Sequence, residues 1–153
     1  MSPTPPLTIL ETPDATLSHA DFCAVPGYLV LRMRNGAESF GDLSTPGSQR
    51  LGGLLASAAA AVETVVKADR VYCLSFCEVE RTLHFHLFPR TEALLEAYCA
   101  ATGAPKKPVD GPAVFAWARA AYPVGADLPA GWPQVDDVCV ALREMLAPAR
   151  SGR

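Results

Sequence analysis

The stretch Thr82-Leu83-His84-Phe85-His86-Leu87-Phe88-Pro89-Arg90 carries the pattern on which the fold expected for this chain rests. Apolar residues occupy every second position from Leu83 to Leu87, which predicts a strand over Arg81–Phe88. Because successive side chains of a strand point to opposite faces, one face is wholly apolar and suited to packing under a helix. That face carries Leu83, Phe85 and Leu87, and the opposite face carries Thr82, His84, His86 and Phe88.

Two imidazoles on one strand face, with Cβ atoms about 6.5–7 Å apart, can take different roles in one catalytic reaction. An unprotonated ring is a nucleophile and a protonated ring stabilises a leaving group, and histidine reaches both states near neutral pH. The pattern alone leaves two alternatives open. His84 and His86 are also compatible with ordinary surface or core histidines, or with a metal site completed by a third ligand.

The composition of the chain predicts a packed globular domain. It has 153 residues, of which half are hydrophobic and 19% are charged. A formal net charge of -3 without a Lys/Arg stripe argues against nucleic acid as a partner. The five cysteines form no disulfide or zinc-knuckle pattern, and residues 1–6 lack the basic and apolar segments of a secretory signal. The longest apolar run is too short and too polar for a membrane span, so a cytoplasmic protein without membrane contact is expected.

Hydrophobic periodicity and turn signals predict strands first, then a long helix, two more strands and further helices. We expect strands over residues 7–10, 15–23, 28–34, 70–78 and 81–88, a long helix over 45–67, and shorter helices over 92–101, 112–122 and 133–146. This order predicts an α+β fold, with a mainly antiparallel sheet of about five strands packed by one long helix and followed by extra C-terminal helices. His19, in the second strand, is expected at the surface.

Several segments, in the right order, resemble the histidine-triad family. In that family three alternating histidines precede a short run ending in Pro-Arg, and His84-Phe85-His86-Leu87-Phe88-Pro89-Arg90 resembles the second half of that signature. Pro26-Gly27-Tyr28-Leu29-Val30-Leu31 resembles the family's glycine-led strand, and Glu38–Leu43 resembles the segment before its long helix. Ala68–Leu74 resembles the strand before the histidines. The resemblance covers about residues 9–90.

The resemblance implies a histidine-triad-like domain over residues 1–103, with residues 104–153 as a helical extension packed on it. It implies a small-molecule nucleotide as substrate and a homodimer as the assembled state. In the family the middle histidine attacks phosphorus and forms a nucleotidyl-histidine that water cleaves. That histidine falls at His84, and His86 would contact the phosphate or the bridging oxygen. No resident cofactor is expected, and any Mg²⁺ would arrive with the nucleotide.

The chain also departs from the family's pattern. The first histidine of the triad falls at Thr82, and the histidine after the glycine-led strand falls near Asn35. Both residues still offer a hydrogen bond that would hold the nucleophile in place. Glu78 lies in a loop that is usually polar and neutral, and a carboxylate facing the site would repel phosphate oxygens. Arg90 is a candidate phosphate ligand, with helix capping or pairing with Glu92 as alternatives.

Three functions remain open on the sequence. The first is a nucleotide phosphohydrolase or nucleotidyl transferase, similar to diadenosine polyphosphate hydrolases, that cleaves a phosphoanhydride or phosphoramidate through His84. The second is a catalytically weakened nucleotide-binding module of the same fold, which the departures from the family pattern favour. The third is a metal-binding protein that uses His84 and His86. Loss of turnover in His84→Ala, nucleotide binding without turnover, and stoichiometric metal in the purified protein distinguish the three.

Overall fold

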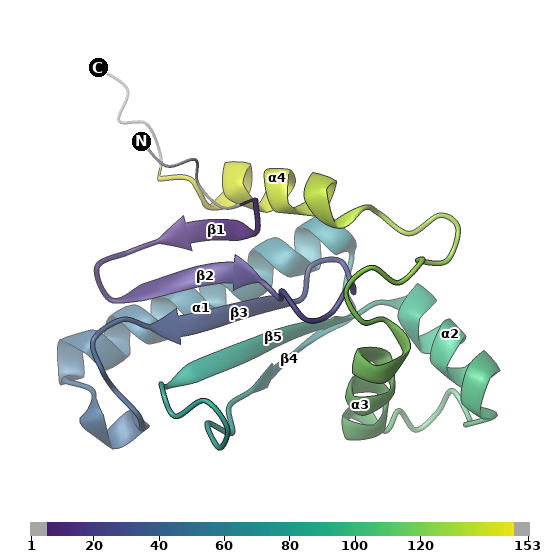
Figure 1. Cartoon of the computed structure of the whole chain (residues 1–153), viewed down its shortest axis with the longest axis horizontal. Helices are drawn as coiled ribbons and strands as arrows, with labels where there is room; N and C mark the ends of the chain where they lie inside the picture. Colours follow the sequence, from purple (N-terminus) through teal and green to yellow (C-terminus); the bar gives the residue numbers. More distant parts are fainter. Residues whose placement is uncertain (1–5, 149–153) are drawn as a thin grey trace.

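Five strands pair into one antiparallel sheet in the computed structural model, which describes residues 6–148 of the chain (Figure 1). Their order across the sheet is β1-β2-β3-β5-β4, and each neighbouring pair is antiparallel. The strands are β1 (Thr8–Glu11), β2 (Ala15–His19), β3 (Leu29–Met33), β4 (Arg70–Leu74) and β5 (His84–Arg90). The strand with the two histidines therefore lies inside the sheet, between β3 and β4.

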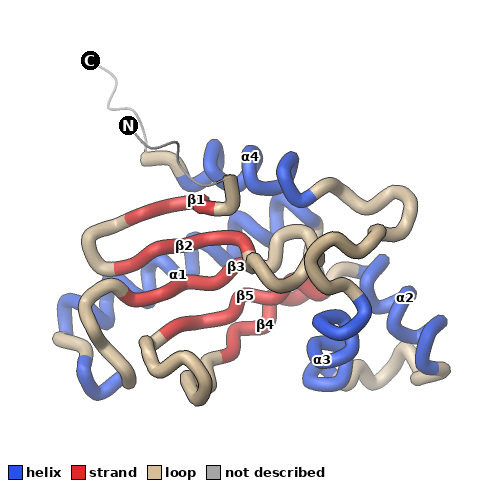
Figure 2. Tube along the Cα trace, in the orientation of Figure 1, coloured by secondary structure: helices blue, strands red, loops and turns tan. Residues whose placement is uncertain are grey.

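Helices pack against both faces of this sheet (Figure 2). The long helix α1 (Thr45–Val66) lies along one face, and α4 (Val135–Leu146) packs against α1 and β1. The opposite face is covered at one end by α2 (Glu92–Thr102) and α3 (Gly111–Ala121), and a 3₁₀ helix (Phe40–Asp42) precedes α1. Of the helices within residues 6–148, none has the length and apolar character needed to cross a bilayer.

The apolar face of β5 packs under α1, as the alternation predicts. Phe85 and Leu87 are buried in one cluster with Ala58 and Val62 of α1. Each large apolar side chain buried in this way contributes about 1.5–3 kcal/mol to stability. A slip of one residue in β5 would turn these side chains to the other face and lose that contribution. The core therefore fixes which face of the strand carries the histidines.

A second cluster forms on the opposite face of the sheet. Tyr28, Val30 and Phe88 are buried there against Leu94 of α2 and Val114 of α3. This cluster covers the part of β5 that contains Phe88. The two histidines, which precede Phe88 on the same face, lie beside the cover that α2 and α3 provide.

Three predicted strands differ from the structure by more than one residue at an end, and the other two differ by one residue at each end. β2 ends at His19 rather than at residue 23, and β4 ends at Leu74 rather than at residue 78. β5 runs from His84 to Arg90 rather than over residues 81–88. Its last residues pair only with β4, because β3 ends where Leu29 lies opposite Leu87. One side of β5 is therefore an edge at that point, and an edge tolerates the missing N–H of Pro89.

The surface position predicted for His19 is wrong. Its side chain is only 2% exposed. Nδ1 lies 3.0 Å from the carbonyl of Ala20 and donates to it, while Nε2 accepts from the N–H of Gly27 at 3.1 Å. The ring is buried without an unsatisfied nitrogen because it bonds the backbone between β2 and β3. Burial lowers the pKa of His19, so the neutral ring that these two hydrogen bonds require is favoured.

The predicted fold class is confirmed: an α+β fold with a five-stranded antiparallel sheet, one long packing helix and extra C-terminal helices. The boundary at residue 103 stays a prediction, and the ends of the two predicted segments, residues 1–5 and 149–153, lie outside the described residues.

Both C-terminal helices contribute to the cores. Val138 and Leu142 of α4 pack in the cluster under α1, and Phe115 of α3 packs in the cluster on the opposite face.

Replacing Gly27 by alanine should destabilise the protein more than the same change at Gly36. Both glycines have positive φ, at 87° and 78°, so alanine costs about 1–2 kcal/mol of backbone strain at either position. A Cβ at Gly27 would also lie 3.0 Å from Cγ1 of Val66, whereas nothing lies within 4 Å at Gly36. Urea midpoints of Gly27→Ala, Gly36→Ala and Gly27→Ala with Val66→Ala measure the difference. Equal losses at the two glycines would show that the contact with Val66 costs nothing.

Candidate active site

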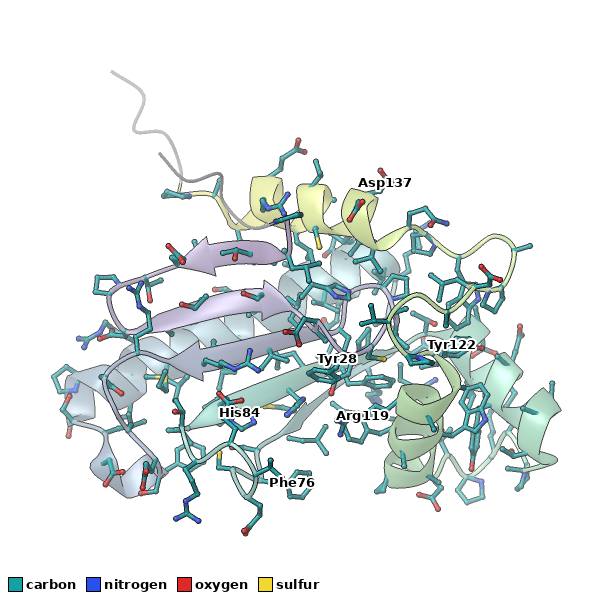
Figure 3. All side chains as sticks on the ribbon, viewed as in Figure 1. Tyr28, Phe76, His84, Arg119, Tyr122 and Asp137 are labelled. Carbon is teal, nitrogen blue, oxygen red and sulfur yellow. The ribbon has the colours of Figure 1, made fainter. Side chains whose placement is uncertain are left out.

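β5 brings His84 and His86 together on the face opposite α1, as predicted. Their ring centroids are 5.2 Å apart, with the rings edge to face. His84 is buried and His86 is half-buried. Figure 3 shows His84, Tyr28 and Arg119 on the same side of the sheet, with Arg119 coming from α3. The two histidines are therefore the starting point for describing a site between the sheet and α3.

The backbone fixes the tautomer of His84. Its Nδ1 lies 2.7 Å from the carbonyl oxygen of Thr82, and a carbonyl oxygen only accepts hydrogen bonds. Nδ1 therefore carries a proton, and in the neutral ring Nε2 keeps an unprotonated lone pair. The contact is possible because Thr82 lies in a bend before β5 begins, which directs its carbonyl toward the ring. The sulfur of Cys77 also approaches this nitrogen, at 3.7 Å.

A buried phenol fixes the tautomer of His86. Its Nδ1 lies 2.7 Å from the hydroxyl oxygen of Tyr28. Burial raises the pKa of Tyr28, so the phenol stays protonated. Within residues 6–148 this hydroxyl has no other hydrogen-bond partner, and its buried O–H would be unpaired if it only accepted, so we assign it as the donor and Nδ1 as the acceptor. In the neutral ring of His86 the proton is then on Nε2, which makes Nε2 a donor.

His86 stays neutral at physiological pH. Burial is the main factor that lowers the pKa of His86 to about 4. Electrostatic interactions with His84, Arg119 and Arg32 lower it further, and the interaction with Glu80 opposes them. In their neutral forms the two rings therefore differ in function. His84 offers a lone pair on Nε2, and His86 offers a hydrogen-bond donor at the same atom.

An ion pair borders the histidines on the β3 side. Arg32 lies directly opposite His84 in the pairing of β3 with β5. Its Nε donates to Oε1 of Glu80 at 2.9 Å, and both side chains are partly exposed. This hydrogen bond is the main cause that lowers the pKa of Glu80, and the two histidines add a smaller effect in the same direction. The carboxylate of Glu80, which Arg32 holds in place, thus lies near enough to the histidines to influence the pKa of His86.

Aromatic side chains border His86 on the α3 side. The centroids of Phe22 and Phe115 lie 6.1 and 6.4 Å from that of His86. The guanidinium of Arg119 lies over both of these rings, with Cζ 5.1 Å from the centroid of Phe22 and 5.3 Å from that of Phe115. Open space lined by these three residues and by Ala116 and Ala120 of α3 measures about 490 Å³. A cation on an aromatic support therefore lies next to the histidines.

The structure does not bring Asn35, Glu78 and Arg90, the other predicted site residues, as close to the histidines. Asn35 is exposed in a turn, where Oδ1 accepts from the N–H of Ala37 at 3.1 Å. Glu78 is exposed in the loop after β4. Arg90 pairs with Asp69 at 3.2 Å, so the pair with Glu92 offered as a sequence alternative is wrong; Glu92 pairs with Lys106 instead. Six residues of strand place its Cα about 20 Å from that of His84. Their roles in binding stay predictions.

The structure adds five residues to the candidate site: Tyr28, Arg32, Glu80, Phe115 and Arg119. Tyr28 and Arg32 carry a usable signal in the sequence, because they alternate with the apolar residues of the predicted strand 28–34. The others come close only through tertiary packing. Among residues 6–148, no three side chains of the His, Cys, Asp and Glu types are grouped so that they could hold a metal ion.

Comparison with known proteins identifies the fold. The sequence matches no protein-family model and no curated protein. Among solved structures, a Hit-like protein involved in cell-cycle regulation from Bartonella henselae is similar, at 17% identity and a TM-score of 0.57 over 94% of this chain and 88% of that one. A histidine triad protein from Bradyrhizobium japonicum is 18% identical, with a TM-score of 0.58 over 91% of this chain and 89% of that one. The chain has the histidine-triad fold.

A third neighbour is a hypothetical histidine triad nucleotide-binding protein from Sulfolobus tokodaii. It is 13% identical, with a TM-score of 0.58 over 91% of this chain and 82% of that one. The structural similarity extends beyond residues 9–90, where the sequence segments resemble the family, because more than nine-tenths of this chain is covered. At these identities the neighbours establish the histidine-triad fold and leave the activity of this chain to be argued from its own residues.

Acid should destabilise the protein as pH falls from about 6.5 toward 4. In the unfolded chain histidine takes up a proton near pH 6.5, whereas folded His86 does so only near pH 4. The unfolded state therefore binds more protons in this window, and the free energy of unfolding falls with pH. His19, whose pKa burial also lowers, adds an effect of the same sign. Urea midpoints measured between pH 7.5 and 4 test the direction.

Proton positions are measured directly by the ¹⁵N shifts of the imidazoles. In the neutral rings we expect the proton of His84 on Nδ1 and that of His86 on Nε2. Tyr28→Phe keeps an aromatic ring but removes the donor to His86, so this variant should give mixed tautomers at His86 and leave His84 unchanged. A proton on Nδ1 of His86 in the wild type would contradict the assignment.

Proposed function

We propose that this chain is a nucleotide phosphohydrolase or nucleotidyl transferase that works through a nucleotidyl-histidine on His84. One observation carries the proposal. The 2.7 Å hydrogen bond from Nδ1 of His84 to the carbonyl of Thr82 leaves Nε2 with a free lone pair. A histidine held in one tautomer by a backbone acceptor is an activated nucleophile, because neither proton removal nor reorientation must precede attack.

The proposed first step is attack of Nε2 of His84 on a phosphorus atom of the nucleotide. A bond forms between nitrogen and phosphorus, and the bond from phosphorus to the bridging atom breaks, with its electron pair leaving on that atom. His86, with its proton on Nε2, donates a hydrogen bond to the bridging atom as negative charge develops there. The ring centroids are 5.2 Å apart, which is compatible with both rings contacting one phosphoryl group.

In the second step water attacks the same phosphorus. The phosphorus–nitrogen bond breaks, the electron pair returns to Nε2 of His84, and the proton of water passes to solvent. The products are a nucleoside monophosphate and the leaving group. In a transferase another hydroxyl compound or phosphate would take the place of water. Neither step requires a resident cofactor, and Mg²⁺ would enter only with a polyphosphate substrate.

The substitution at the first triad position is compatible with this proposal. The group of Thr82 that contacts His84 is its backbone carbonyl, which any residue at this position would supply. The orienting contact of the nucleophile therefore does not depend on the missing histidine. The name of the Sulfolobus tokodaii protein, which includes nucleotide binding, is consistent with a nucleotide as ligand. A homodimer is proposed on the family resemblance alone.

His84→Ala should abolish release of AMP from adenine nucleotides. The substrates are a dinucleoside polyphosphate, an aminoacyl adenylate mimic and an adenosine phosphoramidate, and AMP is measured by chromatography. Removal of a covalent nucleophile lowers turnover by roughly 10³-fold or more, whereas His86→Gln, which removes a donor to developing charge, should lower it by roughly 10²–10³-fold. The wild type and His86→Gln should both form a labelled nucleotidyl-protein that His84→Ala cannot form.

Two outcomes would contradict the proposed reaction. Turnover that persists in His84→Ala would remove His84 from the nucleophile's role. Absence of turnover in the wild type, with a nucleotide that still raises the melting temperature, would identify a nucleotide-binding module of the same fold. Melting temperatures of both variants without ligand serve as the folding control.

A further inference from the structure

Arg119 of α3 is a cation near His86 that no carboxylate of the described part of the chain neutralises. It is exposed, and within residues 6–148 it forms no ion pair or hydrogen bond with a carboxylate. The site's other arginine differs in this respect, since Arg32 is paired with Glu80 at 2.9 Å. Arg119 instead lies over the rings of Phe22 and Phe115. Two aromatic faces hold the guanidinium in place without using its hydrogen-bond donors.

The position of Arg119 along β5 is given by the ring beneath it. Phe115 contacts both His86 and Phe88, with centroids 6.4 and 5.2 Å apart. Since His84, His86 and Phe88 follow one another on one face of the strand, Phe115 lies toward the Phe88 end. Arg119, 5.3 Å from the centre of that ring, lies on the same side. His86 is therefore between the proposed nucleophile and the cation.

We infer that Arg119 binds an anionic leaving group of the substrate, so that the site takes a phosphoanhydride in preference to a phosphoramidate with a neutral amine. This inference rests on the proposed function. If His84 attacks phosphorus and His86 contacts the bridging atom, the leaving group extends beyond His86, toward Arg119. A guanidinium whose donors bond no group among residues 6–148 offers a bidentate site for a phosphate oxygen pair.

The protonation state of His86 supports the same substrate class. An amine leaves a phosphoramidate only when it receives a proton, and His86, with a pKa of about 4, is not an imidazolium at neutral pH. A phosphate leaves as an anion and needs no proton. His86 can therefore assist the departure of a phosphate from a phosphoanhydride, but it is poorly suited to the departure of an amine from a phosphoramidate. Arg119 then supplies the positive charge that His86 lacks.

Calorimetric titration with AMP and α,β-methylene-ADP tests the inference without relying on turnover. The second ligand adds the phosphate of the leaving group, and its bridging carbon prevents cleavage. We expect the wild type to bind α,β-methylene-ADP at least about tenfold more tightly than AMP. Arg119→Gln should weaken binding of α,β-methylene-ADP about tenfold and change that of AMP less than twofold. Arg119→Lys should retain part of the preference, because it keeps the charge but loses the planar fork.

Arg70→Gln is the matched control. Arg70 is an exposed arginine on β4, opposite Arg90 in the strand pairing and about 20 Å along the sheet from His84. This change should leave both affinities within twofold of the wild type. The inference is overturned if the wild type binds the two ligands equally, if Arg119→Gln weakens both by the same factor, or if Arg70→Gln matches Arg119→Gln.

The outcomes also separate this inference from the proposed reaction. If the protein prefers the ligand with the second phosphate through Arg119 but releases no AMP from any substrate, the anion site is supported and the proposed reaction is contradicted. If turnover depends on His84 but the protein shows no such preference, the proposed reaction is supported and the anion site is contradicted. A wild type that binds neither ligand overturns both.

Discussion

The pairing of β3 with β5 is the constraint on which both the core and the candidate site depend. In this register Leu31 lies opposite Phe85 on the face that packs under α1, and Arg32 lies opposite His84 on the other face. Because side chains alternate with a period of two, burial of the apolar pair determines the position of the polar pair. A shift of one residue would expose Phe85 and place the histidines under α1. The free energy of the core therefore sets the geometry of the site.

Within that frame, hydrogen bonds give the two imidazoles different proton positions. His84 donates from Nδ1 to a backbone carbonyl, and His86 accepts at Nδ1 from a buried phenol. Identical side chains two residues apart thus present a lone pair in one case and a proton in the other. A backbone acceptor is independent of side-chain identity, so this contact requires no particular residue at position 82. The contact of His86, by contrast, depends on a side chain, because the phenol of Tyr28 is the group that donates.

Periodicity predicted those parts of the fold that depend on local pattern. The alternation over residues 83–87 was sufficient to place both histidines opposite α1, and the apolar stripe of residues 45–67 was sufficient to locate that helix. Strand ends were less predictable, because they depend on where a neighbouring strand stops, as at Pro89. Glu80 and Arg119 reach the histidines through a loop and a helix whose placement follows from tertiary packing. No local pattern distinguishes Glu80 from Glu78, and the polarity of His19 concealed its burial.

The two arginines of the site differ in what their guanidinium groups already contact. Arg32 is neutralised by Glu80, so its charge contributes little net attraction for a phosphate. Arg119 rests on aromatic faces, which stabilise a cation without cancelling its charge. Between them lies a histidine that burial keeps neutral. Under the proposed function, a site of this kind distinguishes substrates by the charge of the leaving group. Arg119, which has no carboxylate partner among residues 6–148, can bind an anion there, whereas neutral His86 donates a hydrogen bond but does not transfer a proton to an amine.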